Sequence, residues 1–123
     1  MMDKILRILI LEDSVSDADL VEFELQMADL AYTAKRVITK KEFIAALQDF
    51  SPDLIISDYD LPQYDGASAL AEAKARSPEV PFILVSGAVK EDRAKEILTG
   101  GARDYIMKDH LHRLVPAVRR ALA

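Results

Sequence analysis

Five side chains that could bind a metal or take part in a reaction follow directly after short apolar runs of the chain. Glu12 and Asp13 follow the first run, Asp58 the third, Ser86 the fourth and Lys108 the fifth. Three carboxylates brought together repel one another, so their charged forms need a positive neighbour. Oxygen ligands without histidine or cysteine suit Mg²⁺ better than zinc, and one lysine is too little to neutralise three acids. These residues predict a site for a divalent cation and then for an anionic group.

The elements that must position these residues are apolar runs of strand length, separated by segments of helical length. The runs cover residues 5–11, 31–37, 53–57, 80–85 and 104–107. Four are nearly continuous, which is typical of strands covered on both faces, whereas the second is more polar and indicates an edge strand. Short connections between such elements imply parallel strands with right-handed crossovers. We predict an α/β fold: a (βα)5 doubly wound, five-stranded parallel sheet in a three-layer sandwich.

Local signals indicate where several helices begin and end. Thr39 and Glu42 have the spacing of a capping box, which predicts the start of the second helix. The third helix is expected to begin near Gly66. Gly100 is expected to take the left-handed conformation that ends the fourth helix. Pro116 fits the last helix only in its first turn.

The carboxyl ends of parallel strands lie at one edge of a sheet, where α/β folds place their chemistry. Taken singly, each residue has a more ordinary interpretation. An acid such as Asp13 after a strand is more often a helix N-cap than a ligand. Ser86 alone is more often a turn residue, and Lys108 alone is more often a solvated side chain. Asp58 is harder to explain in this way because the strand before it reads as a core strand. The joint occurrence at four of five strand ends favours a functional site.

Composition limits the classes of function. The chain has 123 residues, which suits one domain, and it has no cysteine, so disulfides and thiolate metal sites are excluded. Twenty-one acidic residues against 16 basic ones give a net charge of -5, which argues against a nucleic-acid surface. The longest apolar stretch, residues 8–11, is far short of a membrane span. We therefore expect a soluble, cytoplasmic domain without direct nucleic-acid or membrane contacts.

The order and spacing of these motifs resemble those of response-regulator receiver domains from residue 5 to about residue 122. The matching residues are the pair Glu12 and Asp13, Asp58 with the preceding strand, Leu61, Pro62, Asp65 and Gly66, Ser86 with Gly87 and Ala88, and residues 101–108, which end in Lys108. The resemblance implies a flavodoxin-like strand order, 2-1-3-4-5. It also implies a phosphorylation-switched signalling domain of two-component phosphorelays rather than an enzyme acting on other molecules.

The resemblance implies a chemical role for each acid of the site. Asp58 would take a phosphoryl group from a phosphohistidine of a sensor histidine kinase or a histidine phosphotransfer protein. Glu12, Asp13 and Asp58, with the main-chain carbonyl of Asp60, would hold Mg²⁺. Positioning and charge neutralisation carry most of phosphoryl transfer, so the physical logic agrees with these roles.

The resemblance also implies a switch. Ser86 and Lys108 would contact the phosphoryl oxygens, and Tyr105 would move into the space that Ser86 vacates. The surface of the fourth helix, fifth strand and fifth helix would then change for a downstream output domain or protein, with a phosphorylation-linked dimer as one outcome. We further expect Asp60 and Ala88 to tune the lifetime of the phosphoryl group, because they flank the path of the hydrolytic water.

One departure from the family pattern follows the lysine, where Asp109 replaces the usual cis proline. We expect a trans bond and an altered loop there, because a non-proline cis bond costs about 2.5–4 kcal/mol. This residue keeps open an alternative function, a receiver-like interaction module without phosphoryl turnover. Phe23 and Met27 also allow two interpretations: packing at the edge of the first helix, or an exposed apolar spot for a partner.

Other functions fit less well. Asp58-Tyr59-Asp60 after an apolar strand also occurs in haloacid-dehalogenase-type phosphatases, but 123 residues leave no room for the rest of such an enzyme. A flavodoxin-like nucleotide module would need a glycine-rich loop after the first strand, which is absent from the sequence. We expect residues 1–123 to hold one receiver domain and no output domain.

Overall fold

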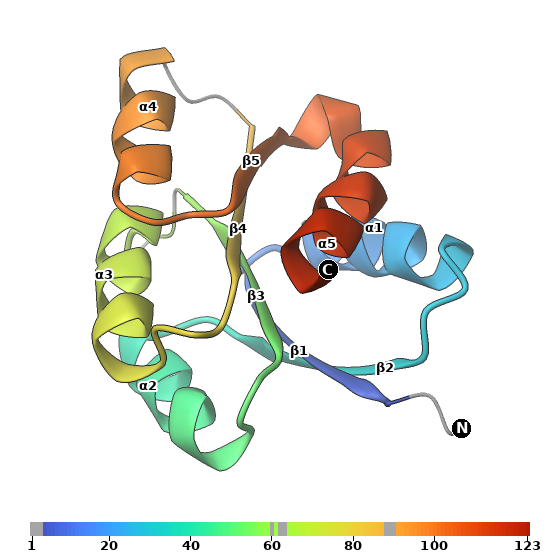
Figure 1. Cartoon of the computed structure of the whole chain (residues 1–123), viewed down its shortest axis with the longest axis horizontal. Coiled ribbons are helices and arrows are strands. Elements are labelled where there is room, and N and C mark those ends of the chain that lie inside the picture. The colour runs from blue at the N-terminus through green and yellow to red at the C-terminus, as the bar shows by residue number, and fades with distance from the viewer. Residues whose placement is uncertain (1–3, 60, 62–63, 88–90) are drawn as a thin grey trace.

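Five parallel strands form a single sheet in the order β2-β1-β3-β4-β5 in the computed structural model, which describes residues 4–59, 61, 64–87 and 91–123 (Figure 1). The strands are β1 (Leu6–Leu11), β2 (Tyr32–Val37), β3 (Leu54–Asp58), β4 (Phe82–Ser86) and β5 (Asp104–Met107). The helices are α1 (Val15–Met27), α2 (Lys40–Asp49), α3 (Gly66–Arg76), α4 (Glu91–Thr99), the 3-10 helix η1 (Lys108–Arg113) and α5 (Leu114–Leu122). The predicted (βα)5 fold and its strand order are confirmed.

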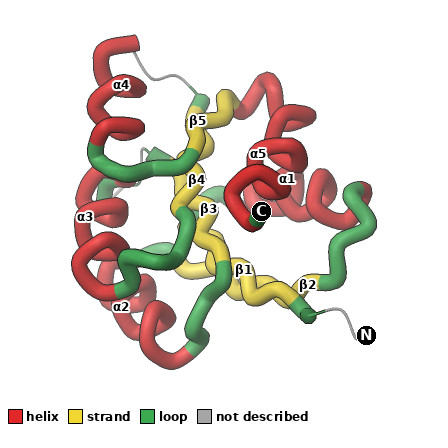
Figure 2. Tube along the Cα trace, viewed as in Figure 1, coloured by secondary structure: helices red, strands yellow, loops and turns green. Residues whose placement is uncertain are grey.

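The sheet is the middle layer of three. Helices α2, α3 and α4 cover one face, and α1 and α5 cover the other (Figures 1 and 2). Successive residues of a strand point to opposite faces, so Ile55 packs in the core under α2–α4, whereas Ile56 packs in the core under α1 and α5. The two cores therefore pack against opposite faces of the same central strands.

Burial explains the composition of the strands. Every residue of β3 and β4 is buried, as expected for strands covered on both faces, while β2 lies at the edge of the sheet and is mostly exposed or half-buried. The apolar runs locate the strands to within two residues. β3 extends one residue further than predicted and ends on Asp58, and β4 ends on Ser86. Both side chains thus lie within the regular hydrogen-bonded sheet.

Most of the predicted helix signals are confirmed. The side chain of Thr39 accepts a hydrogen bond from the Glu42 amide, and the Glu42 carboxylate accepts one from the Thr39 amide, so the capping box is complete. The third helix begins at Gly66. Pro116 is the third residue of α5 and so lies in its first turn, although η1 comes before this helix.

The prediction for the end of α4 is wrong by one residue. Gly101, with φ of 112°, takes the left-handed conformation, and Gly100 does not. Gly100 still makes a helical hydrogen bond to the Glu96 carbonyl at 2.8 Å. The amides of Gly101 and Ala102 then bond back to Leu98 and Ile97, which is the Schellman pattern with its left-handed residue at Gly101.

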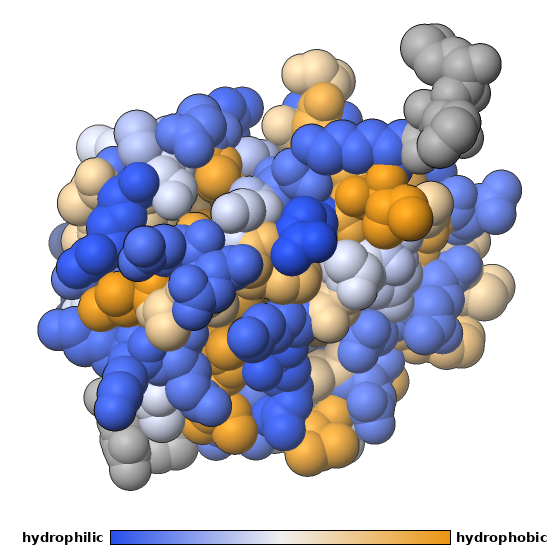
Figure 3. Space-filling model, turned by 90° about the horizontal axis from the view of Figure 1, so that it is seen from below, coloured by the Kyte–Doolittle hydropathy of each residue, from blue (hydrophilic) through white to orange (hydrophobic). Residues whose placement is uncertain are grey.

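Exposed apolar side chains are concentrated on α1. Phe23 and Met27 are 55% and 71% exposed, so both side chains contribute apolar surface that is open to solvent. The face of the molecule in Figure 3 shows hydrophobic residues in small separate groups among hydrophilic ones. Within the part of the chain that the structure describes, every helix is too short or too polar to cross a membrane.

Candidate functional site

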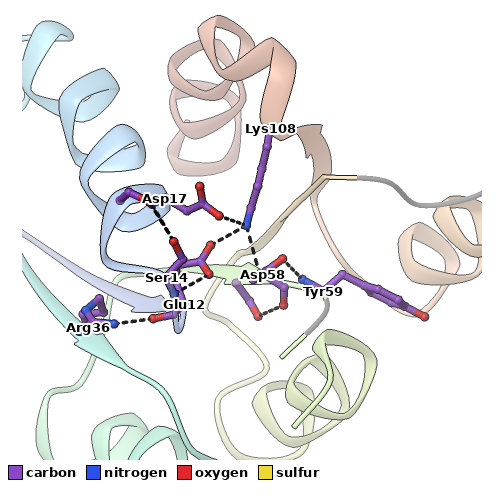
Figure 4. Close-up of polar contacts among 9 residues, drawn as sticks. Glu12, Ser14, Asp17, Arg36, Asp58, Tyr59 and Lys108 are labelled. Atoms are coloured by element: carbon purple, nitrogen blue, oxygen red, sulfur yellow. Dashed lines mark hydrogen bonds and ion pairs between the residues drawn. The ribbon is translucent and has the colours of Figure 1, made fainter. Parts of the chain in front are cut away.

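The predicted site residues meet at the carboxyl edge of the sheet. Strand register brings them level, since Leu11 pairs with Ser57, Asp58 with Val85 and Ser86 with Met107. The residues that end or follow these four strands therefore come together, as Figure 4 shows for Glu12, Asp58 and Lys108.

Glu12, Asp13 and Asp58 form a group able to share a cation. Each offers a carboxylate oxygen, and these oxygens lie within 4.8 Å of one another. Glu12 and Asp58 are only 3% and 7% exposed, whereas Asp13 is half-buried. Buried carboxylates without matching positive charge are costly, so this arrangement fits a hard divalent ion with oxygen ligands.

Backbone contacts hold Glu12 in place. The Arg36 guanidinium, from the end of β2, donates a 2.8 Å hydrogen bond to the Glu12 carbonyl. The Ser14 amide donates to Oε2 of the Glu12 side chain at 3.2 Å. Burial is the main cause that raises the pKa of Glu12 to about 7, and the nearby Asp58 charge adds to it against the opposing hydrogen bond from Lys108.

The two carboxylate oxygens of Asp58 have different partners. The Tyr59 amide donates to Oδ1 at 2.7 Å, and Lys108 Nζ donates to Oδ2 at 3.3 Å. The Ser57 hydroxyl donates to the Asp58 carbonyl at 2.8 Å, which fixes the backbone at the end of β3. The result is an oriented, nearly buried carboxylate with an ammonium group beside one oxygen.

Lys108 has one partner that the sequence patterns did not single out. Its Nζ lies 2.7 Å from Oδ2 of Asp17, 2.9 Å from Oε1 of Glu12 and 3.3 Å from Oδ2 of Asp58 (Figure 4). Burial opposes the charged ammonium, but hydrogen bonds to Asp17 and Glu12 outweigh it and raise the pKa of Lys108 above its ordinary value. Asp17 was overlooked because an acid in the first turn of a helix is ordinary capping chemistry.

Ser86 and Tyr105 carry hydroxyls without hydrogen-bond partners among the described residues. Ser86 is 1% exposed and is the last residue of β4, so its buried hydroxyl lies at the carboxyl edge of the sheet. Tyr105 is half-buried in β5 and packs against the core under α2–α4. A buried hydroxyl without a partner has lost its hydration, and it is suited to a ligand oxygen.

Two predicted residues, Asp60 and Ala88, lie outside the described residues. The peptide bond between Lys108 and Asp109 is trans, as expected. The chain passes from β5 directly into η1, in which His110 departs from helical geometry with φ of -128° and ψ of 40°. Replacement of the usual proline by Asp109 thus leaves Lys108 in contact with the acids of the site.

Comparisons with known proteins agree with this geometry. A family model described as "Response regulator receiver domain" matches residues 8–119. The chain is 31% identical over 105 residues to the two-component response regulator ORR8 of Oryza sativa subsp. indica, covering 82% of this chain and 84% of that protein. It is 27% identical over 117 residues to the transcriptional regulatory protein ZraR of Salmonella typhimurium, covering 94% of this chain but only 26% of ZraR.

Solved structures agree as well. A CheY-like response regulator receiver domain protein from Methanospirillum hungatei superposes with a TM-score of 0.84 at 26% identity, covering 97% of this chain and 94% of the other. The chain thus spans about a quarter of ZraR, but most of the smaller relatives.

Proposed function

The chain belongs to the response regulator receiver domain family, and on this premise we propose that Asp58 accepts a phosphoryl group from a phosphohistidine. The donor would be a sensor histidine kinase or a histidine phosphotransfer protein. An oxygen of the Asp58 carboxylate bonds to phosphorus while the phosphorus–nitrogen bond breaks, and its electron pair returns to the imidazole. Hydrolysis of the acyl phosphate later restores the carboxylate, so the domain acts only on its own aspartate.

The observation that carries this proposal is the contact between Lys108 and Asp58. An ammonium 3.3 Å from Oδ2 of a nearly buried carboxylate places positive charge where phosphoryl oxygens would arrive. Fixed charge next to the transferring group is the main contribution that a protein makes to this reaction. The same contact favours a phosphoacceptor over the alternative of an interaction module without phosphoryl turnover.

Glu12, Asp13 and Asp58 would hold the divalent cation, which their oxygen-only ligand set matches to Mg²⁺. When bound, Mg²⁺ supplies positive charge beside the transferring oxygens. The main-chain carbonyl of Asp60 remains a predicted fourth ligand. The roles of Asp60 and Ala88 in phosphoryl lifetime also remain predictions.

Ser86 and Tyr105 would convert phosphorylation into a change of surface. The unpartnered hydroxyl of Ser86 supports a role as donor to a phosphoryl oxygen. Tyr105 has a half-buried ring and an unpartnered hydroxyl among the described residues, which supports its role as the side chain that moves. The surface formed by α4, β5 and α5 would then engage an output domain or protein, or a second copy of the chain.

The direct test is the mass of the intact protein after incubation with acetyl phosphate and Mg²⁺. We expect one added phosphoryl group in the unaltered chain and none in Asp58→Asn. Asp49→Asn removes an exposed acid at the end of α2 and serves as the matched control. We expect this control to be modified normally, and chelation of divalent cations to prevent the modification of every variant. An unmodified native chain, or a phosphoryl group that survives Asp58→Asn, contradicts the proposal.

A further inference from the structure

We propose that Asp17 is a positioning residue that holds the Lys108 ammonium beside Asp58. This inference rests on the proposed function, because it gives Asp17 a part in phosphoryl transfer to Asp58. Asp17 lies in the first turn of α1, on the other side of the Lys108 ammonium from β5, the strand that leads to Lys108 (Figure 4).

The contact geometry ranks Asp17 first among the partners of Lys108. An ammonium has three N–H donors, and Nζ of Lys108 lies 2.7, 2.9 and 3.3 Å from carboxylate oxygens of Asp17, Glu12 and Asp58. The Asp17 contact is the shortest, and it joins residues 91 positions apart in the chain. Asp17 therefore holds the ammonium from the side of α1.

A comparison of two helix starts shows that the Asp17 carboxylate does not complete a capping box, although its amide donates to the Ser14 hydroxyl. Asp17 and Glu42 both stand three residues after an N-cap, Ser14 in α1 and Thr39 in α2. The Glu42 carboxylate accepts from the N-cap amide at 3.0 Å, which completes a capping box. In α1 the Ser14 amide instead donates to the Glu12 side chain. This arrangement leaves the Asp17 carboxylate for Lys108.

Asp17 also differs from the other two acids in what else it could bind. Glu12 and Asp58 belong to the acidic group that could share a cation, whereas Asp17 does not belong to it. Its carboxylate therefore stays available to Lys108 whether or not a cation occupies that group. A lysine side chain is long and flexible, and fixing one conformation costs up to about 2 kcal/mol of entropy. Without Asp17, Glu12 and Asp58 remain as partners, and we expect the Lys108 side chain to be less fixed and more often in solvent.

The first test measures the rate at which the full chain is phosphorylated by acetyl phosphate with Mg²⁺. Asp17→Asn keeps the shape of the side chain and removes its charge, and we expect a rate about fivefold lower, the size of effect typical for a partly exposed ion pair. Asp19→Asn makes the same change at an exposed position of α1 and should leave the rate unchanged. In a Lys108→Gln background, adding Asp17→Asn should have no further effect, because its target is gone.

The second test needs no phosphodonor. In ¹³C-labelled protein, the two Hε protons of Lys108 should have distinct chemical shifts in the unaltered chain and in Asp19→Asn. In Asp17→Asn they should approach the single averaged shift of an exposed lysine. Assignment of the signal follows from its loss in Lys108→Gln.

The outcomes separate the two proposals. A native chain that takes no phosphoryl group overturns the proposed function. Distinct Hε shifts that persist in Asp17→Asn overturn the present inference, whichever way the first result falls. A phosphorylation rate that is unchanged or higher in Asp17→Asn also overturns it, because Asp17 would then be idle or would draw the ammonium away from Asp58.

Discussion

Oε1 of Glu12 lies 2.9 Å from Nζ of Lys108, yet the pKa of Glu12 is raised. Burial accounts for this result, because the loss of hydration around a nearly buried carboxylate exceeds what one shared ammonium restores. Lys108 divides its charge among three carboxylates. Without a bound cation, the positive charge of Lys108 is therefore too small to neutralise these three carboxylates.

The first prediction concerns stability against pH. The pKa of Glu12 rises from 4.5 to about 7 on folding, so between these values the folded chain binds more protons than the unfolded chain. The free energy of unfolding should therefore fall as pH rises from about 4.5 to 7, by up to about 3 kcal/mol from this group. Urea unfolding at several pH values, with a chelator present to remove divalent cations, measures this change in the free energy of unfolding. Glu12→Gln should lose this dependence, whereas Glu79→Gln, at an exposed position, should keep it; equal slopes in both variants contradict the assignment.

The second prediction compares two buried serines. Ser86 has no hydrogen-bond partner for its hydroxyl among the described residues, while the Ser57 hydroxyl donates to the Asp58 carbonyl. Without a phosphodonor, Ser86→Ala should raise the free energy of unfolding by about 1 kcal/mol, and Ser57→Ala should lower it by about the same amount. Chemical denaturation of both variants measures the difference. A loss of stability in Ser86→Ala would show that its hydroxyl is partnered in the unphosphorylated state.

The third prediction concerns the close approach of α3 to the end of β3. A Cβ at Gly66 would lie 2.8 Å from the Asp58 carbonyl oxygen and 2.9 Å from the Tyr59 Cα, so these backbones would have to separate. Gly66→Ala should cost about 1–3 kcal/mol of stability and should slow phosphorylation by displacing Asp58. A Cβ at Gly87 meets no described atom within 4 Å, and thermal unfolding of Gly87→Ala should change little. Equal melting temperatures for the two variants would refute the packing argument.

The fourth prediction tests the end of α4. Gly101 has φ of 112°, and a Cβ there would lie 2.7 Å from Lys74 Cε. Gly101→Ala should therefore destabilise the chain by more than about 1 kcal/mol. Gly100→Ala should cost less, because its backbone stays out of the left-handed region and its nearest Cβ contact is 3.2 Å. The order of the two melting temperatures decides which glycine ends the helix.

The sequence was a good guide wherever local patterns determine structure. Nearly continuous apolar runs located β3 and β4, because strands covered on both faces are apolar along most of their length. Asp58 at the end of β3 and Lys108 directly after β5 were then expected to meet, because parallel strands end at one edge of a sheet. The capping box at Thr39 could also be predicted from the sequence, since all its partners lie within four residues.

Contacts between segments that are distant in the sequence could not be predicted in this way. Asp17 looks like a capping residue in the sequence, and its contact with Lys108 depends on how α1 packs against the turn after β5. The left-handed glycine was misplaced because Gly100 and Gly101 are equally able to adopt that conformation, and the return bonds from Gly101 and Ala102 make the choice. Both outcomes depend on side-chain or backbone partners that no local pattern specifies.

The contact between Asp17 and Lys108 has a consequence for the order of events during synthesis. Glu12 follows β1 and Asp17 lies in α1, so both are made early, but their ammonium partner Lys108 comes 91 residues after Asp17. A growing chain on the ribosome therefore carries unneutralised acids until the segment after β5 emerges and the last strand joins the sheet. Because domains generally fold as units, the phosphoacceptor would become competent only when almost the whole domain has been translated.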